Sequence, residues 1–133
     1  MIFVDTGAFL ARYVLADQHH AESLAAWENL AKDPRRLFTS NLILSETFTL
    51  LGRRAGYAFA AERARNILDS REMTVLRPTE EQERAALGWF EKFADQKVSY
   101  TDCVSFALMR HHRLPQAFTF DRHFHLAGFE LWR

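Results

Sequence analysis

The chain has 133 residues, 48% of them hydrophobic and 26% charged, which favours a single domain with its own core. Its 17 basic and 17 acidic residues give a formal net charge of zero, which argues against the broad basic surface of many nucleic-acid-binding proteins. No apolar stretch approaches the roughly 20 residues that cross a bilayer, and a lone cysteine, Cys103, excludes an intramolecular disulfide framework. We therefore expect a cytoplasmic protein with no membrane partner.

Strand-like and helix-like segments alternate along the chain. In order, strands are expected at residues 1–5, 37–39, 73–76, 117–120 and 129–132, and helices at about 7–15, 18–32, 41–54, 57–70, 79–93 and 101–112. Ser40 or Asn41 is expected to cap the third helix, and Thr79 begins a capping-box pattern, TEEQ, at the start of the fifth.

This alternation predicts an α/β protein, namely one three-layer α/β/α domain over residues 1–133 with a central parallel sheet of four to five strands. Right-handed crossovers place the carboxyl ends of all these strands on one edge of the sheet. Ligands of such sheets bind outside that edge. Polar residues that directly follow the strands are therefore the first candidates for a functional site.

Four acidic residues lie where a charge is unexpected. Asp5 and Asp121 directly follow apolar strand segments, and Asp102 opens a helix-like stretch. Glu46 lies on the apolar stripe of its helix, which is expected to be buried. Carboxylates at such positions are costly unless something positive meets them, and a divalent cation is the simplest partner for all four. Each acid also has a structural alternative: a helix cap for Asp5 and Asp102, the start of a turn for Asp121, and an arginine salt bridge for Glu46.

Four segments carry these acids in order along nearly the whole chain: IFVDT (2–6), SNLILSE (40–46), SYTDCVSFA (99–107) and TFDRHF (119–124). Together they resemble the motifs of PIN-domain ribonucleases. The resemblance is strongest to the small, single-domain VapC type, the toxins of bacterial and archaeal toxin–antitoxin pairs. Each segment alone is a weak signal, whereas the ordered set is specific.

The resemblance implies a PIN-like fold and a metal-dependent endoribonuclease that leaves a 5′-phosphate and a 3′-hydroxyl. It implies that Mg²⁺, or Mn²⁺ in its place, is bound by four catalytic acids: Asp5, Glu46, Asp102 and Asp121. Thr6 and Thr119 would line the site and help to hold metal-bound water or phosphate. This chemistry is physically reasonable, because Mg²⁺ prefers oxygen ligands and a bound metal ion activates water. We expect Glu46 to hold or deprotonate the attacking water.

Substrate and partners follow from the same reading. Arg122, which directly follows Asp121, is expected to contact RNA phosphate, with a solvated surface position as its alternative. The further arginine candidates, each with the same alternative, are Arg35, Arg36, Arg53, Arg54, Arg110 and Arg113. The resemblance also implies a small antitoxin protein that neutralises the chain, and a homodimer.

Other functions remain open at this point. The chain could be a housekeeping PIN-type nuclease without an antitoxin, or a non-catalytic binding module with the same fold. The segment VDTGA (4–8) also resembles the active-site loop of aspartic proteases, but those enzymes are all-β. A phosphoryl-transfer enzyme with a second acid two residues after its nucleophilic aspartate is disfavoured, because Gly7 occupies that position. The six histidines do not match the spacing of a structural zinc site.

Overall fold

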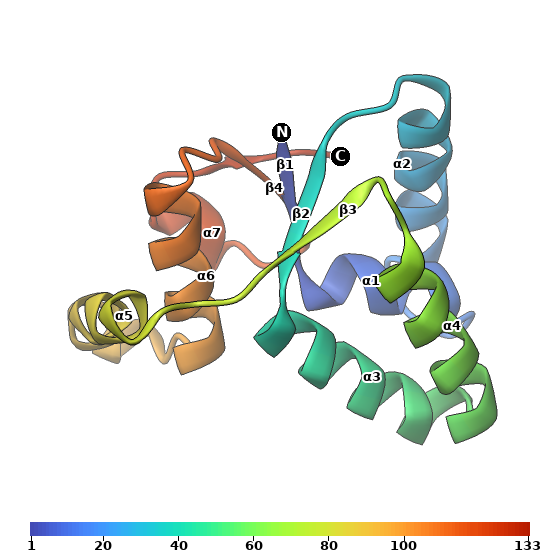
Figure 1. Cartoon of the computed structure of the whole chain (residues 1–133), viewed down its shortest axis with the longest axis horizontal. Helices are drawn as coiled ribbons and strands as arrows, with labels where there is room; N and C mark the ends of the chain where they lie inside the picture. Colours follow the sequence, from blue (N-terminus) through green and yellow to red (C-terminus); the bar gives the residue numbers. More distant parts are fainter.

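Five short strands form one parallel sheet between two groups of helices in the computed structural model, which describes residues 1–133 (Figure 1). The elements in chain order are β1 (Ile2–Val4), α1 (Thr6–Tyr13), α2 (His20–Lys32), β2 (Leu37–Ser40), α3 (Asn41–Ala55), α4 (Tyr57–Asp69), β3 (Met73–Leu76), α5 (Glu80–Lys92), the 3₁₀ helix η1 (Ala94–Gln96), α6 (Tyr100–His111), β4 (Gln116–Phe118), α7 (His123–Leu126) and β5 (Glu130–Leu131). The predicted α/β class and parallel sheet are confirmed, with five strands.

Several boundaries differ from the sequence-based expectation. The strand expected over 117–120 ends at Phe118, so Thr119 and Phe120 lie outside it, and the short helices η1 and α7 were not predicted. The two predicted caps, those of α3 and α5, are confirmed. Ser40 Oγ accepts a hydrogen bond from Ile43 N, and Thr79 forms a complete capping box with Gln82.

The strand order is β3-β2-β1-β4-β5, and every neighbouring pair is parallel. The chain first moves outward from β1 to β2 and β3, and then returns through α5 and α6 to place β4 on the other side of β1. This reversal makes the gap between β1 and β4 the topological switch point, where ligands of open α/β sheets bind. The carboxyl ends of β1 and β2 point downward in Figure 1, towards the starts of α1 and α3.

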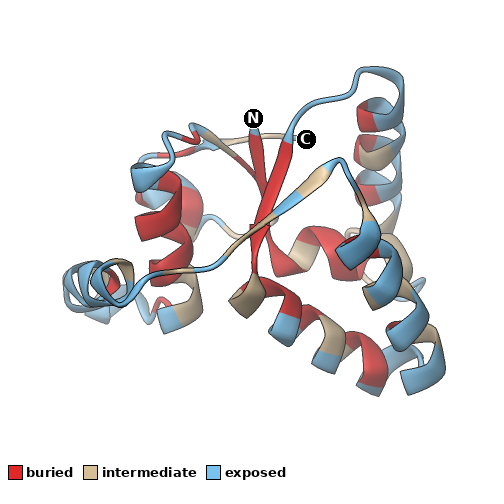
Figure 2. Cartoon of the chain, in the orientation of Figure 1, coloured by how far each residue is buried: buried red, intermediate tan, exposed pale blue.

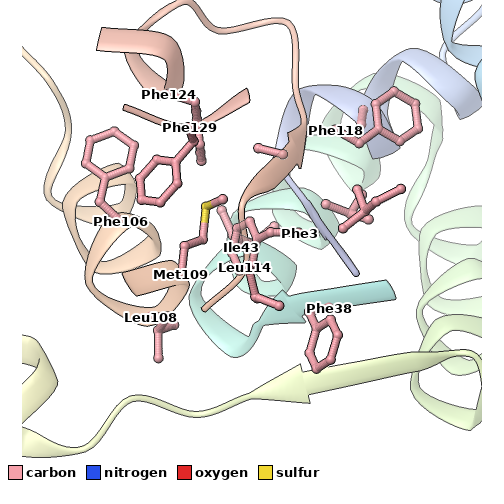
Figure 3. Packing of buried hydrophobic residues seen from close by; sticks show 14 of the residues in the cluster. Phe3, Phe38, Ile43, Phe106, Leu108, Met109, Leu114, Phe118, Phe124 and Phe129 are labelled. Atoms are coloured by element: carbon pink, nitrogen blue, oxygen red, sulfur yellow. The ribbon is translucent and has the colours of Figure 1, made fainter. Parts of the chain in front are cut away.

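Apolar packing on both faces holds the sheet between the helices. All three residues of β1 are fully buried, which explains why this strand is a continuous apolar run without alternation. In Figure 2 the buried residues gather on the central strands and on the inner faces of α3 and α6. Phe106 of α6 and Phe124 of α7 meet edge to face, with ring centroids 5.0 Å apart, in the cluster of Figure 3.

No helix is long and apolar enough to cross a membrane.

Candidate metal centre

Asp5 and Thr119 lie side by side at the switch point, because Val4 and Phe118 are paired in the register of β1 and β4. Asp5 N donates to Phe118 O at 3.1 Å, and Thr119 Oγ1 donates to Asp5 Oδ2 at 2.8 Å. Asp5 is 6% exposed and Thr119 is fully buried. Asp5 occupies the N-cap position of α1, as its structural alternative expected, but its side chain makes no capping hydrogen bond.

Thr119 also fixes Asp121. Its Oγ1 accepts a hydrogen bond from Asp121 N at 3.0 Å, so one hydroxyl orients the acids that follow both central strands. Asp121 Oδ1 in turn accepts a hydrogen bond from His123 N at 2.9 Å and lies 3.1 Å from His123 Nδ1. The Asp121 carboxylate is also within hydrogen-bonding reach of the Asp102 carboxyl. Asp121 therefore begins an Asx turn, which was its structural alternative, and it does so while lying at the centre. The contact between its carboxylate and the His123 ring was not predicted.

Asp102 reaches the same place from α6. Ser99 caps this helix by accepting a hydrogen bond from Asp102 N at 3.1 Å, which fixes Asp102 in the first turn. One carboxylate oxygen each of Asp102 and Asp121 and one ring nitrogen of His123 lie within 4.8 Å of one another. Residues far apart in the sequence therefore come close enough to hold a metal ion.

Glu46 corrects one expectation. The buried side of α3 carries Ile43, Leu44, Thr47 and Leu51, whereas Glu46 is exposed. The residue is still close enough to raise the pKa values of Asp5 and Asp102 through charge repulsion. Glu46 therefore belongs to the rim of the site and not to its buried centre.

The centre is unfavourable for negative charge. Burial raises the pKa of Asp5 to about 6, with smaller contributions from Asp121 and Glu46, although the hydrogen bond from Thr119 partly opposes them. Burial also raises the pKa of Asp102 to about 8, followed by repulsion from Asp5 and Asp121. Asp102 lies at the positive end of α6, which ordinarily favours a carboxylate, so burial and repulsion outweigh the helix dipole here.

No lysine or arginine neutralises this charge. None of the ion pairs in the structure joins a basic side chain other than His123 to any of the four acids, which also removes the arginine salt bridge considered for Glu46. Thr6 Oγ1 is buried at the start of α1 and has no hydrogen-bond partner. Carboxylates without counter-charge and a free hydroxyl are the donor set that a hard divalent cation such as Mg²⁺ fits. Arg122 is exposed beside this centre and forms no ion pair.

Comparisons with known proteins identify the family of the chain. Residues 2–130 match the family model of the PIN domain. The 23S rRNA-specific endonuclease VapC20 of Mycobacterium tuberculosis is 37% identical over 129 residues, which are 97% of this chain and 95% of that protein. A VapC ribonuclease of Archaeoglobus fulgidus is 31% identical over 134 residues, 98% of this chain and 84% of that protein.

Among solved structures, the crystal structure of VapC20 from Mycobacterium tuberculosis, described as a sarcin–ricin loop cleaving toxin, superposes with a TM-score of 0.87 at 36% identity. The match covers 97% of this chain and 96% of that one. The chain therefore belongs to the PIN-domain family, and within it to the VapC type.

Proposed function

We propose that this chain is an endoribonuclease that depends on Mg²⁺, or on Mn²⁺ in its place, and acts as the toxin of a toxin–antitoxin pair. One observation carries the proposal: Asp102 and Asp121 meet at the switch point of the sheet, Asp5 is close enough to repel both, and no lysine or arginine neutralises them. The names of the relatives, an rRNA endonuclease and a ribonuclease, support RNA as the substrate. An RNA substrate of this kind puts the proposed activity in the cytoplasm.

Each residue has a role in the proposed reaction. Asp5, Asp102 and Asp121 would hold the metal ion, which supplies charge neutralisation and an activated water when bound. Glu46, on the exposed rim, would complete the acidic set and take the proton of the water that attacks the phosphodiester. The 3′-oxygen then leaves with a proton from solvent, which gives a 3′-hydroxyl and a 5′-phosphate.

The flanking side chains would position these groups. The buried hydroxyl of Thr6 is free to bind a metal-bound water or a phosphate oxygen, whereas that of Thr119 keeps Asp5 and Asp121 in place. Arg122, exposed directly after Asp121, would bind substrate phosphate.

RNA cleavage by the purified protein tests the proposal. Ribosomal RNA and a synthetic hairpin with the sequence of the sarcin–ricin loop are the first substrates to try, given the description of the relative. Cleavage should require added Mg²⁺ or Mn²⁺ and should fall at least about a hundredfold in Asp5→Asn and Asp121→Asn, because each loses a charged metal ligand. The matched control is Asp95→Asn, an exposed acid in η1 that should cleave like the wild type. Undiminished cleavage by either site variant, or in EDTA, would refute the assignment.

A groove on the helical face supports the proposed antitoxin. It encloses about 670 Å³ between α1, α2 and α4, and 10 of its 17 lining residues are hydrophobic, including Leu24, Trp27 and Phe59. Arg12, Arg35 and Arg63 line it with only one acid, Glu72. An amphipathic segment with acidic residues beside its apolar ones fits this combination.

The toxin role has its own test in cells. Expression of the wild type alone should arrest growth, and Asp102→Asn should remove the arrest. Co-expression of the product of a short neighbouring gene should also remove it. Harmless expression of an enzyme that cleaves RNA in vitro would favour a housekeeping nuclease instead.

We also propose that two copies pair through an apolar surface of α5 and α6. Leu87, Phe90 and Tyr100 are 46%, 45% and 36% exposed, and the rings of Phe90 and Tyr100 lie 6.0 Å apart. Apolar side chains gathered in this way on a surface are typical of contacts between subunits. Sedimentation should give a dimer for the wild type and a monomer for Phe90→Lys; a monomeric wild type would refute this pairing.

A further inference from the structure

A second hollow adjoins the acidic rim and is not explained by metal binding. It encloses about 410 Å³ between α3 and the start of α6, and Glu46 is one of its lining residues. Ser45, Thr49 and Arg53 line it from α3, and Thr101 lines it from α6. The hollow thus adjoins the proposed catalytic centre at Glu46 and extends away from it along α3.

Its position follows from the helical repeat of α3. Glu46, Thr49 and Arg53 are spaced three and four residues apart, so they lie on one face of the helix. The seven steps from Glu46 to Arg53 span about 10 Å, at about 1.5 Å per residue. That length corresponds to about three stacked nucleotides at about 3.4 Å each.

Arg53 is the only basic residue that lines this hollow, and its guanidinium has no partner within the protein. It takes part in no ion pair of the structure. It also makes no side-chain hydrogen bond and does not stack on an aromatic ring. In contrast, Arg35 pairs with Asp33, Arg36 lies over Phe38, and Arg110 donates to Ala127 O. Arg54, Arg113 and Arg122 also lack such contacts, but none of them lines this hollow, so it is the position of Arg53 that distinguishes it.

The hydroxyl groups in the hollow are also available to a ligand. Ser45 and Thr101 make no hydrogen bond through their side chains, and Ser99 Oγ, which accepts from Asp102 N, still has its proton to donate. Thr49 Oγ1 donates to Ser45 O and can still accept. Hydroxyl groups together with a guanidinium suit a ribose–phosphate backbone, where a 2′-hydroxyl both donates and accepts.

We propose that this hollow is a subsite for the RNA backbone next to the scissile phosphate, and that Arg53 binds a phosphate there. The inference rests on the proposed ribonuclease function and extends it to a residue outside the four acids. Arg53 holds the RNA strand along α3, whereas the acidic centre carries out the cleavage step. Loss of its guanidinium therefore weakens substrate binding and leaves the chemical step unchanged.

The adjacent Arg54 is a matched control. It is exposed, lies in the same last turn of α3, and has no ion pair, but it does not line the hollow. Replacing either arginine with Gln removes one positive charge and the same favourable interaction with the carboxyl end of the helix. A difference between the two variants therefore reports the subsite and not the overall charge.

The experiment measures steady-state cleavage of a labelled RNA hairpin with the sarcin–ricin loop sequence by the full chain in Mg²⁺. Arg53→Gln should raise KM about tenfold, as expected for one charge-assisted hydrogen-bonded contact, and should leave kcat within about twofold. The slope of log(kcat/KM) against log salt should become shallower by about one. Arg54→Gln should match the wild type within about twofold in both constants, and Arg53→Lys should recover part of the lost affinity.

Two results would overturn the inference. Equal KM values for Arg53→Gln and Arg54→Gln would show that no specific phosphate contact exists, and a fall in kcat alone would place Arg53 outside substrate binding. Either result can be distinguished from failure of the proposed function, because in that case the wild type itself would cleave no RNA. Melting temperatures of the three variants within about 1 °C of the wild type would show that the fold is intact, as expected for exposed side chains without partners.

Discussion

Replacing Asp102 with Asn should stabilise the protein when no metal is bound. In the folded protein the pKa of this carboxyl is raised from 3.8 to about 8, chiefly by burial and then by Asp5 and Asp121. The folded state therefore binds more protons than the unfolded state between these two values, and its stability falls as the pH rises through that window. Asn at this position has no charge to bury and can donate its amide to Asp121.

The expected magnitude follows from the same pKa difference. At about 1.4 kcal/mol per pH unit, charging Asp102 costs the folded state on the order of 5 kcal/mol by pH 8. The carboxyl is only partly buried and its neighbours can move apart, so we expect a measured gain for Asp102→Asn of about 2 kcal/mol. For a domain of this size that gain corresponds to a rise in Tm of about 5–10 °C.

Thermal unfolding by circular dichroism between pH 5 and pH 8 measures this gain. In EDTA the advantage of Asp102→Asn over the wild type should be largest at pH 8 and should shrink towards pH 5, where the wild-type carboxyl is already protonated. Saturating Mg²⁺ should stabilise the wild type much more than the variant, because binding to the folded state alone adds stability. Asp95→Asn, at an exposed acid, should change neither profile. A variant less stable than the wild type in EDTA at pH 8 would mean that the Asp102 carboxylate is already satisfied, and would refute the reasoning.

Three further predictions concern the other parts of the site and the groove. Thr119→Val removes the hydroxyl that joins Asp5 to Asp121, so it should lower stability by about 1–3 kcal/mol and weaken Mg²⁺ binding about tenfold, measured by thermal unfolding and metal titration; unchanged metal affinity would contradict the role of that hydroxyl. The affinity for Mg²⁺ should rise from pH 5 to pH 8, because the raised pKa values of Asp5 and Asp102 require both to lose protons before they bind metal; a flat pH profile by calorimetry would exclude these two as ligands. Leu24→Asp places a charge in the apolar groove at a side chain that is 38% exposed, so it should abolish binding of a co-expressed antitoxin and leave RNA cleavage unchanged; retained binding would place the partner elsewhere.

The sequence was sufficient to place the two aspartates after the central strands. Both follow short apolar runs that were expected to be strands, and strand ends of one parallel sheet share an edge. Asp5 directly follows β1, whereas β4 ends at Phe118, so Asp121 lies beyond Thr119 and Phe120. Their direct link through Thr119 could not be predicted, because it depends on β4 lying beside β1. That strand order depends on the long crossover through α5 and α6, and no local sequence pattern predicts where such a crossover returns to the sheet.

Glu46 shows the limit of helical periodicity. Positions 42, 46 and 50 and positions 43, 47 and 51 of α3 are neighbouring stripes, and both contain apolar residues. The structure buries the second stripe, in which Thr47 satisfies its hydroxyl by donating to Ile43 O at 2.7 Å. A threonine that bonds to the preceding turn can occupy a core position, so a polar residue there does not exclude burial.

The central claim, that these carboxylates jointly hold a catalytic divalent cation, is tested most directly by anomalous diffraction from crystals of the wild type grown in Mn²⁺. An anomalous peak within about 2.5 Å of carboxylate oxygens of Asp5 and Asp121 is expected, and it should be absent from crystals of Asp5→Asn. The wild-type protein used for these crystals should first be shown to cleave RNA. If its crystals then show no metal at these carboxylates, or show metal at a different set of side chains, the central claim is contradicted.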